Sequence, residues 1–451
     1  MSNTEQICGL VKDHQAELIA ISDQVWHLAE LRFNEYQSCA LHEELLERHG
    51  FSLQRQAGGI PTAFVAEYGN GGPIIGFLGE YDALPGLSQQ SGVAQPQPIE
   101  EGAPGHGCGH NLLGTGALGA ALALRYYLEK NNLSGTVRYY GCPAEEGGGG
   151  KVLMVEAGLF ADADIALTWH PSDATYVQSA PTLATKSVNF YFSGRSAHAA
   201  KNPHIGRSAL DAVELTNIGV NYLREHVPSD ARIHYAITDA GGSAPNVVQP
   251  KASVIHQIRS PRGGQVDEIY ERVCDIARGA ALMTGTELKI VDETRYLNII
   301  PNTTLEGLLH QQLEKIGLPV YDEADREFAR EIRATLSEEE KKQSNIPETQ
   351  GLDLSEKMPP FRPHYGMHWA STDVGDVSWA IPTAQFRAAV WAVGTSAHSW
   401  QAVAQGKSQL AYKGMLLASK VMAAAAVELL HNPQIIEAAK AEQVQARAAQ
   451  S

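Results

Sequence analysis

The sequence is poor in positive charge. Its 451 residues contain 35 Lys and Arg against 51 Asp and Glu, which gives a formal net charge of −16 at pH 7. Nucleic acids and anionic membranes attract basic surfaces. The charge balance therefore argues against both as partners, and it favours solubility.

Cysteine is scarce, and long apolar runs are missing. The five cysteines are odd in number and widely spaced, and no apolar segment of the kind found in export signals follows Met1. The most apolar late stretch, Met415 to Leu430, is short for a membrane span and is interrupted by Lys420. We therefore expect free thiols, no membrane span, and a location in the reducing cytoplasm.

The sequence does contain short apolar runs that alternate with helical segments. Runs such as Pro73 to Gly79, Thr136 to Cys142 and Asp164 to Thr168 resemble buried strands, and Leu112 to Lys130 reads as a helix between two of them. This alternation is typical of a mostly parallel sheet covered by helices on both faces. The sequence predicts an α/β fold, long enough for one large or two ordinary domains.

One glycine-rich stretch brings two metal-type side chains close together. In Gly105 to Gly116, GHGCGHNLLGTG, the thiol of Cys108 lies two residues before the imidazole of His110. The glycines let the backbone bend, so both short side chains could close on one metal ion. An isolated pair of this kind is more often a small buried thiol and a core histidine. The pair becomes informative only together with the donors that follow other strands.

Further metal-type side chains follow three other predicted strands. One strand runs into Glu145, Glu146 and four glycines, the next ends at His170, and a late extended stretch leads to His398. Because parallel strands finish on one edge of a sheet, we expect these groups to share one crevice. Each histidine alone could be a core or surface residue, and the two glutamates could belong to a solvated loop. The recurrence at strand ends favours a shared site.

These donors exceed the needs of one tetrahedral zinc ion with an open water position. Thiolate, imidazole and carboxylate ligands suit two neighbouring divalent ions that share ligands, and either zinc or manganese accepts such a mixture. Glu145, beside a ligand, is then expected to act as a base. We predict metal ligation by Cys108, His110, Glu146, His170 and His398.

After the strand that ends at His170, the pattern changes. Alternating segments such as Thr185 to Gly194 and helical segments such as Gly206 to Val227 follow in the order β-α-β-β-α-β, which is that of a ferredoxin-like split βαβ unit. We predict a catalytic domain formed by residues 1–185 and 300–451, with a second, α+β domain of residues 186–299 inserted in it. The charged segment 322–353 is expected to be a surface excursion, and residues from 438 onwards a polar tail.

Six motifs occur in order along the chain: GHGCGHN, PAEEGGGG, TWHP, SGRSAHAA, GGSAPNVVQP and GTSAHSW. In this set the chain resembles the di-metal peptidases of metallopeptidase family twenty, and within it the amidohydrolase branch. The resemblance implies a catalytic domain with an inserted lid and dimerisation domain, two divalent metal ions, and the ligand and base assignments given above. The branch usually has Asp after Cys-Gly-His, whereas this chain has Asn111, a departure that concerns hydrogen bonding behind the ligands.

Within the second domain, the resemblance implies roles for three more residues. His198 would reach the active site of the partner subunit and stabilise the oxyanion there, and Asn246 and Arg259 would help to hold the substrate carboxylate. Outside their motifs, they read as a surface histidine, a turn residue and a charge at a strand end. The implied assembly is a homodimer, or a heterodimer with a paralogous subunit.

The activity that the resemblance implies is metal-dependent hydrolysis of an amide bond. The substrate would be an N-acyl amino acid or a dipeptide-like amide, with p-aminobenzoyl-glutamate as the leading candidate. The alternative within the branch is a dipeptidase for substrates with a basic C-terminal residue, although Lys201 and Arg207 near His198 favour an acidic one. Two further alternatives are a non-catalytic metal-binding or interaction protein and a thiol enzyme with Cys108 as nucleophile.

Overall fold

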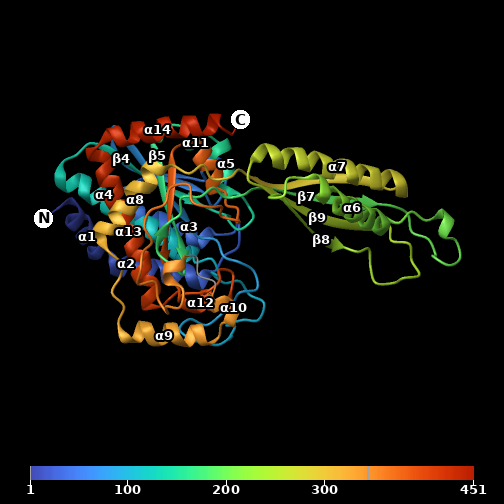
Figure 1. Ribbon diagram of the computed structural model, residues 1–451, viewed down its shortest axis with the longest axis horizontal. Helices are drawn as coiled ribbons and strands as arrows, with labels where there is room; N and C mark the ends of the chain where they lie inside the picture. Colours follow the sequence, from blue (N-terminus) through green and yellow to red (C-terminus); the bar gives the residue numbers. More distant parts are fainter. Residues whose placement is uncertain (1, 343–345, 451) are drawn as a thin grey trace. The chain divides into compact units, whose positions relative to one another are not determined.

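The structure is a computed structural model that describes residues 2–342 and 346–450 (Figure 1). Residues 343–345, which belong to the predicted surface excursion, lie outside the described residues. The described chain forms two compact units. The first comprises the residues up to Ala180 together with Ile300–Gly366 and Val377–Ala449, and the second comprises Pro181–Ile299, Met367–Asp376 and Gln450.

The first unit is built on a seven-stranded sheet with the strand order β1-β2-β4-β3-β5-β11-β6. The neighbours β4, β3, β5 and β11 are parallel, while β1, β2 and β6 are antiparallel to the strands beside them. The strands are β1 (Ser52–Arg55), β2 (Phe64–Asn70), β3 (Ile74–Glu80), β4 (Gly135–Cys142), β5 (Ile165–Ser172), β6 (Tyr176–Val177) and β11 (Thr383–Ala389). Residues that follow the four parallel strands therefore meet along one edge of the sheet, and the predicted α/β fold class is confirmed.

Helices pack on this sheet, and α4 lies at the centre of the core with α13 against it (Figure 1). Two glycines of α4 allow this close packing, because a Cβ at Gly116 would lie 2.6 Å from Trp169 Nε1 and one at Gly119 would lie 2.4 Å from Ser419 Oγ. The helices are α1 (Asn3–Asp13), α2 (Gln15–Leu28), α3 (Tyr36–Arg48), α4 (His110–Asn131), α5 (Gly150–Glu156), α8 (Thr303–Ile316), α9 (Glu323–Ala334), α10 (Glu338–Lys342), α11 (Val374–Ala380), α12 (Trp400–Gln405), α13 (Gln409–His431) and α14 (Pro433–Ala448).

Helix α13 is the one helix of the described residues whose length and composition would allow it to cross a membrane. However, 72% of its most apolar window is buried inside the structure, where it packs against α1, α4 and α8. A core helix of a soluble protein meets the same criterion, so this is weak evidence for a membrane span.

Two C-terminal expectations differ from the structure. The predicted polar tail is wrong, since α14 begins at Pro433 and buries Ile436 and Ala439 in the main core. Only these few apolar positions mark the helix, which is why the sequence reads as polar there. Within the charged excursion, α9 likewise buries Ala329 and Ile332 in a small apolar cluster, so this part of the segment is packed rather than only solvated.

The second unit is a four-stranded antiparallel sheet with the order β10-β7-β9-β8 and two helices. Helices α6 and α7 pack against each other and against the sheet, and they enclose a separate apolar core. The sequence placed the start of this unit inside β7 and assigned Met367–Asp376 to the other domain. The elements follow the split βαβ order: β7 (Ala184–Ser193), α6 (Ala209–Leu223), β8 (Arg232–Asp239), β9 (Lys251–Ser260), α7 (Gly263–Thr284) and β10 (Glu287–Tyr296).

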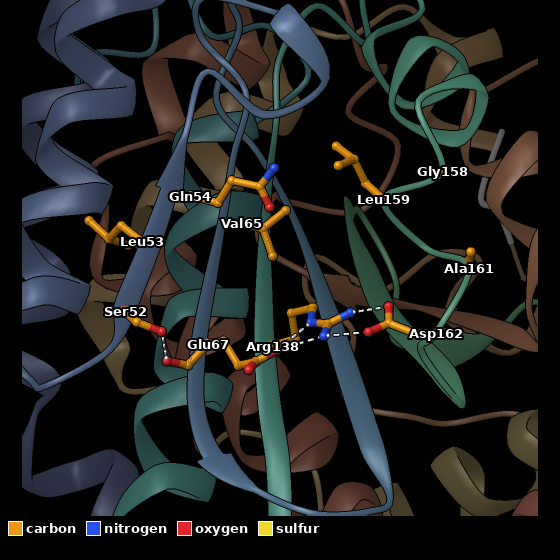
Figure 2. Close-up of a pocket in the computed structure, with 10 residues that line it drawn as sticks. All are labelled: Ser52, Leu53, Gln54, Val65, Glu67, Arg138, Gly158, Leu159, Ala161 and Asp162. Atoms are coloured by element: carbon orange, nitrogen blue, oxygen red, sulfur yellow. Dashed lines mark hydrogen bonds and ion pairs between the residues drawn. The ribbon is translucent and has the colours of Figure 1, made fainter.

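A cavity of about 530 Å³ opens in the first unit beside β1, β2 and β4 (Figure 2). Arg138 on its floor donates to Glu67 and to Asp162 at distances of 2.6 to 3.0 Å. The guanidinium is thus neutralised by two carboxylates of the protein itself. None of the predicted metal donors lines this cavity, so it is separate from the candidate site.

Candidate metal centre

The predicted donors of the first unit lie where the parallel strands end. His110 is the first residue of α4, Glu146 follows β4, His170 lies near the end of β5, and His398 follows β11. Cys108 Sγ lies 3.5 Å from His170 Nε2, and His398 Nε2 lies 3.2 Å from Glu146 Oε1. The structure therefore brings together side chains that are nearly three hundred positions apart in the sequence.

The five donors form two groups that share Cys108. One group is Cys108, His110 and His170, and the other is Cys108, Glu146 and His398. Within each group the donor atoms lie within 4.8 Å of one another, a spacing that ligands around a single ion can adopt. A shared thiolate between two triads is the arrangement expected for two neighbouring ions with a common ligand.

Several polar atoms of the centre lack the hydrogen bonds that buried polar atoms normally form. His110 Nε2, Glu146 Oε1 and Glu80 Oε2 are buried and have no well-aligned hydrogen-bond partner among the described residues, although Glu80 Oε2 lies 3.3 Å from His110 Nε2 and Glu146 Oε1 lies 3.2 Å from His398 Nε2. Leaving such an atom unpaired costs about 1–3 kcal/mol. Cations at this position would satisfy all three atoms.

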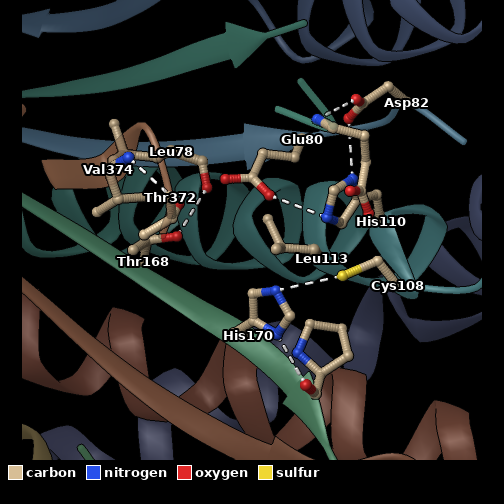
Figure 3. Close-up of polar contacts among 12 residues, drawn as sticks. Leu78, Glu80, Asp82, Cys108, His110, Leu113, Thr168, His170, Thr372 and Val374 are labelled. Carbon is tan, nitrogen blue, oxygen red and sulfur yellow. Dashed lines mark hydrogen bonds and ion pairs between the residues drawn. The ribbon is translucent and has the colours of Figure 1, made fainter. Parts of the chain in front are cut away.

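Second partners orient the imidazoles toward the centre (Figure 3). His110 Nδ1 pairs with Asp82 Oδ1 at 2.8 Å, and His170 Nδ1 lies 2.8 Å from the Pro171 carbonyl oxygen. Asp82 Oδ2 also accepts from the Glu146 N–H at 2.8 Å. These contacts leave the Nε2 atoms to face a metal, and one carboxylate positions two of the donors.

The electrostatics of the centre favour positive charge. Burial alone would lower the pKa of His110, but Cys108 and Asp82 raise it well above its ordinary value. Hydrogen bonds to Cys108 and Glu146 raise the pKa of His398 to about 10. Both shifts report a negative potential where the donor atoms meet, which is the potential that attracts divalent cations.

Glu145 lies at the edge of the same centre. Its carboxylate is within 4.8 Å of donor atoms of Glu80 and His110. Glu80 in turn forms a fully buried ion pair with Lys151, 2.6 Å from Oε1 to Nζ. Sequence reasoning missed Lys151, because a lysine after a glycine run reads as a surface residue.

The loop that carries Glu145 and Glu146 is held in a strained shape. Ala144 has a left-handed backbone with φ of 56°, and its N–H donates to Glu35 Oε1 at 2.8 Å. The Thr62 hydroxyl donates to the other oxygen of Glu35 at 3.0 Å. Burial, and after it the charge of Asp82, raises the pKa of Glu35 to about 7. Non-glycine residues in this conformation cluster at functional sites.

The glycine run after Glu146 serves the loop itself. The N–H groups of Gly148 and Gly149 both donate to the Ala144 carbonyl, and a Cβ at Gly150 would lie 1.9 Å from the Pro143 carbonyl oxygen. The glycines therefore allow the loop to approach its own backbone closely. His398 also has a left-handed backbone, with φ of 60°, and its N–H donates to the Gly107 carbonyl at 2.8 Å.

The three predicted residues of the second unit do not all come together. His198 and Asn246 are exposed on neighbouring loops, where His198 bridges to Val247 and the Asn246 carbonyl accepts from the Ala199 N–H. Arg259 lies near the far end of β9 and donates to Gln257 and Ser371. Within this unit, the first two residues form one patch and Arg259 lies apart from it.

Two other residues that the sequence singled out have local roles. Arg207 donates to the carbonyls of His204 and Gly206 in its own loop. Asn111 is buried and donates to Ser22 and Gly406, so it joins α4 to its neighbours rather than supporting a metal donor.

A centre with two overlapping donor triads and an adjacent carboxylate, at the strand ends of an α/β fold, defines a di-metal hydrolase. The sequence profile of peptidase family M20/M25/M40 matches residues 76–361. The chain is 46% identical to one of the subunits of the p-aminobenzoyl-glutamate hydrolase of Escherichia coli (strain K12), over 94% of this chain and 91% of the relative. The chain belongs to peptidase family M20/M25/M40, as its motifs indicated, and is a hydrolase of amide bonds.

Other relatives agree with this membership. The chain is 30% identical to the Xaa-Arg dipeptidase of Mus musculus, over 95% of this chain and 90% of the relative. Among solved structures, a dinuclear metal-binding peptidase of Bacillus subtilis superposes with a TM-score of 0.61 at 17% identity, covering 93% of this chain and 99% of that one. An aminobenzoyl-glutamate utilization protein of Klebsiella pneumoniae superposes with a TM-score of 0.57 at 17% identity, covering 90% and 96%. These structural matches support the fold.

Proposed function

We propose that the chain hydrolyses the amide bond of p-aminobenzoyl-glutamate or a close N-acyl amino acid, with two divalent metal ions. The observation that carries the proposal is the meeting of two donor triads at Cys108 beside the carboxylate of Glu145. The 46% identity to a p-aminobenzoyl-glutamate hydrolase over nearly the whole chain supports the substrate.

In this proposal, Cys108, His110 and His170 would hold one ion, and Cys108, Glu146 and His398 would hold the other. Zinc suits the thiolate, and manganese also accepts the imidazole and carboxylate donors. When bound, the ions supply a water of lowered pKa and polarise the substrate carbonyl.

The chain's own residues would manage the protons and the orientation. Glu145 accepts a proton from the attacking water while the water oxygen forms a bond to the carbonyl carbon of the substrate. The same carboxyl then donates that proton to the leaving nitrogen as the C–N bond breaks. His198 would stabilise the oxyanion when the lid domain of a partner subunit closes, and Asn246 and Arg259 would hold the substrate carboxylate.

A dipeptidase for substrates with a basic C-terminal residue is the second candidate, and the similarity to an Xaa-Arg dipeptidase supports it. The two candidates differ in the charge that the leaving residue brings to its pocket. We therefore propose to assay metal-reconstituted enzyme against p-aminobenzoyl-glutamate, p-aminobenzoyl-arginine and Xaa-Arg dipeptides. Preference for the glutamate substrate supports the first candidate, and preference for the arginine substrates would replace it with the second.

The same assay tests the class of chemistry. Glu145→Ala is expected to keep its metal content and lose most turnover, and chelation is expected to abolish activity in the wild type. Full activity after chelation would instead support Cys108 as a nucleophile. Purified protein with neither metal nor turnover would support a non-catalytic interaction protein.

We further propose that the second unit forms a homodimer through α6 and β8. Strand β8 is one of the two edge strands of its sheet within the described residues. Apolar side chains of the two elements are solvent-exposed, namely Tyr222 (74%), Ile218 (51%), Ile237 (46%) and Tyr235 (41%). Exposed apolar surface beside an unpaired strand edge is suited to pairing with a second chain.

Light scattering after gel filtration tests the dimer. Tyr222→Asp with Ile237→Asp should yield monomers, while Leu282→Asp on α7, which is 84% exposed, serves as the matched control and should stay dimeric. A monomeric wild type that pairs only with an added paralogous subunit would favour the heterodimer. A cytoplasmic location is proposed as well, because all five cysteines are free thiols.

A further inference from the structure

A second cluster of metal-type donors lies in the first unit, away from the centre described above. It consists of His14 at the start of α2, Glu17 in the first turn of α2, and His49 at the end of α3. Their donor atoms all lie within 4.8 Å of one another, and the cluster shares no residue with the catalytic donors. We propose that His14, Glu17 and His49 form a separate Zn²⁺ site that joins the start of α2 to the end of α3.

The distances fit one small ion. His49 Nε2 lies 3.0 Å and His14 Nδ1 lies 3.7 Å from Glu17 Oε2. Ligands of a tetrahedral zinc ion with bonds of about 2.0–2.1 Å are separated by about 3.3 Å. Shifts of a few tenths of an ångström therefore bring each imidazole nitrogen to ligand spacing from Glu17, and the two imidazole nitrogens lie within 4.8 Å of each other. Two imidazoles and one carboxylate with an open fourth position are a donor set that zinc accepts.

Hydrogen bonds and ring contacts from neighbouring side chains already orient the three donors, as is usual for metal ligands. His49 Nδ1 lies 2.8 Å from the Tyr126 hydroxyl, which leaves Nε2 to face the ion. Arg48 binds the second oxygen of Glu17 at 2.9 Å. The His14 ring stacks on Tyr126 with ring centroids 4.9 Å apart. Such outer partners fix ring orientation and strengthen metal binding.

The site is also accessible and ready to bind. The side chains of His14, Glu17 and His49 are 19%, 27% and 14% exposed, so an ion can enter from solvent. Arg48 opposes a cation in part, but its charge is already paired with Glu17.

Zinc stoichiometry in the full-length protein tests the proposal. Each protein is incubated with excess Zn²⁺ and then dialysed. The wild type should hold one more ion per chain than the double variant His14→Gln, His49→Gln. His310→Gln is the matched control, because His310 pairs with Glu314 at 3.5 Å but belongs to no group of three metal-type donors among the described residues. It should retain the wild-type count. Equal counts in the wild type and the double variant would overturn the proposal.

Cobalt substitution separates the two kinds of site. Co²⁺ at a centre containing Cys108 gives a thiolate charge-transfer band, whereas Co²⁺ bound by His14, Glu17 and His49 adds d–d absorption only. Loss of the second signal alone in the double variant is the expected result. Loss of the thiolate band instead would place the extra ion at the catalytic centre.

A milder variant keeps the proposal testable if the double variant does not fold. Tyr126→Phe keeps all three donors and the ring that stacks on His14, but it removes the hydroxyl that pairs with His49 Nδ1. It should therefore weaken Zn²⁺ binding at this site by about 10- to 100-fold. Unchanged affinity would contradict the proposal.

Discussion

Glu35 is the residue whose removal tests the geometry of the Glu145 loop most directly. Its carboxylate accepts from the Ala144 N–H at 2.8 Å and from the Thr62 hydroxyl at 3.0 Å. Glu35 therefore holds the strained turn that precedes Glu145. We predict that Glu35→Ala lowers kcat by about 10- to 100-fold, because a displacement of about 1 Å in a reacting group can cost about 100-fold.

The magnitude follows from opposing terms at Ala144. A non-glycine residue in the left-handed region costs about 1–3 kcal/mol, and a hydrogen bond to a charged group contributes about 1.5–3 kcal/mol. With Glu35 present the two are comparable, so the turn holds. Without it, only the two hydrogen bonds to the Ala144 carbonyl from Gly148 and Gly149 still oppose the strain. Ala144 is then expected to relax toward the ordinary helical or extended region, moving Glu145 with it.

Two companion variants separate positioning from other effects. In Glu35→Gln, the amide oxygen still accepts from the Ala144 N–H, so kcat should lie between the values of the wild type and of Glu35→Ala, since a neutral hydrogen bond contributes about 1 kcal/mol less than a charged one. Ala144→Gly removes the Cβ strain of about 1 kcal/mol, which corresponds to about fivefold in rate. Added to Glu35→Ala, it should therefore recover about fivefold of the lost kcat.

The assay is steady-state hydrolysis of p-aminobenzoyl-glutamate with metal content measured on the same samples. Metal content should be unchanged in each variant, because Asp82 still holds the Glu146 N–H at 2.8 Å when Glu35 is replaced. The loss should fall on kcat rather than KM. If Glu35→Ala keeps wild-type kcat, or if Ala144→Gly recovers none of its loss, the loop is not held in the way described.

Three further variants address the base, the support of the donors and a buried acid. Glu145→Gln should keep its metal and lose about 10²- to 10⁴-fold in kcat, the usual contribution of a general base. Asp82→Asn should weaken metal affinity by about 10- to 100-fold, since Asp82 orients His110. Burial raises the pKa of Glu306 from 4.5 to about 7, so its contribution to stability is fully present below pH 4.5 and is lost as the pH rises through 7. Glu306→Gln should therefore match the wild type at pH 4.5 and exceed its unfolding free energy by about 3 kcal/mol at pH 8.5, measured by urea unfolding.

Each of these three outcomes has a counterpart that would contradict it. Loss of metal in Glu145→Gln would make Glu145 a ligand instead of a base. Wild-type affinity in Asp82→Asn would mean that His110 is oriented by other contacts. A Glu306→Gln variant whose stability follows the same pH dependence as the wild type would show that Glu306 is ionised at no cost.

The meeting of the metal-type donors at one edge of the sheet could be predicted from the sequence. Strand ends can be recognised from apolar runs and the residues that follow them, and parallel strands must finish on one edge. This is why Cys108, His110 and His170 could be predicted to meet without any knowledge of the distances between them. Their roles as ligands stay predictions until metal is measured.

Buried charges behind the site could not be predicted in the same way. Glu35 and Lys151 are fully buried in the structure, yet acids and lysines are mostly exposed, so the sequence offers no reason to place them inside. Their burial depends on partners contributed by distant segments, such as Thr62 for Glu35 and Glu80 for Lys151. Pairings of this kind become visible only when the fold is known.

The charge of the centre explains why two ions suit it better than one. With Cys108 as thiolate, five anionic groups surround the donor atoms, namely Glu80, Asp82, Cys108, Glu145 and Glu146. The ammonium of Lys151 neutralises one of them. The guanidinium of Arg387, 3.1 Å from His170 Nδ1, is a second cation, so three negative charges remain. A single divalent ion would leave one of them uncompensated in a largely buried site, which is unfavourable, whereas a second ion removes it. Metal titration of the stripped protein should therefore show a second ion binding with an affinity comparable to that of the first, and a centre that saturates at one ion would require one of these acids to be protonated.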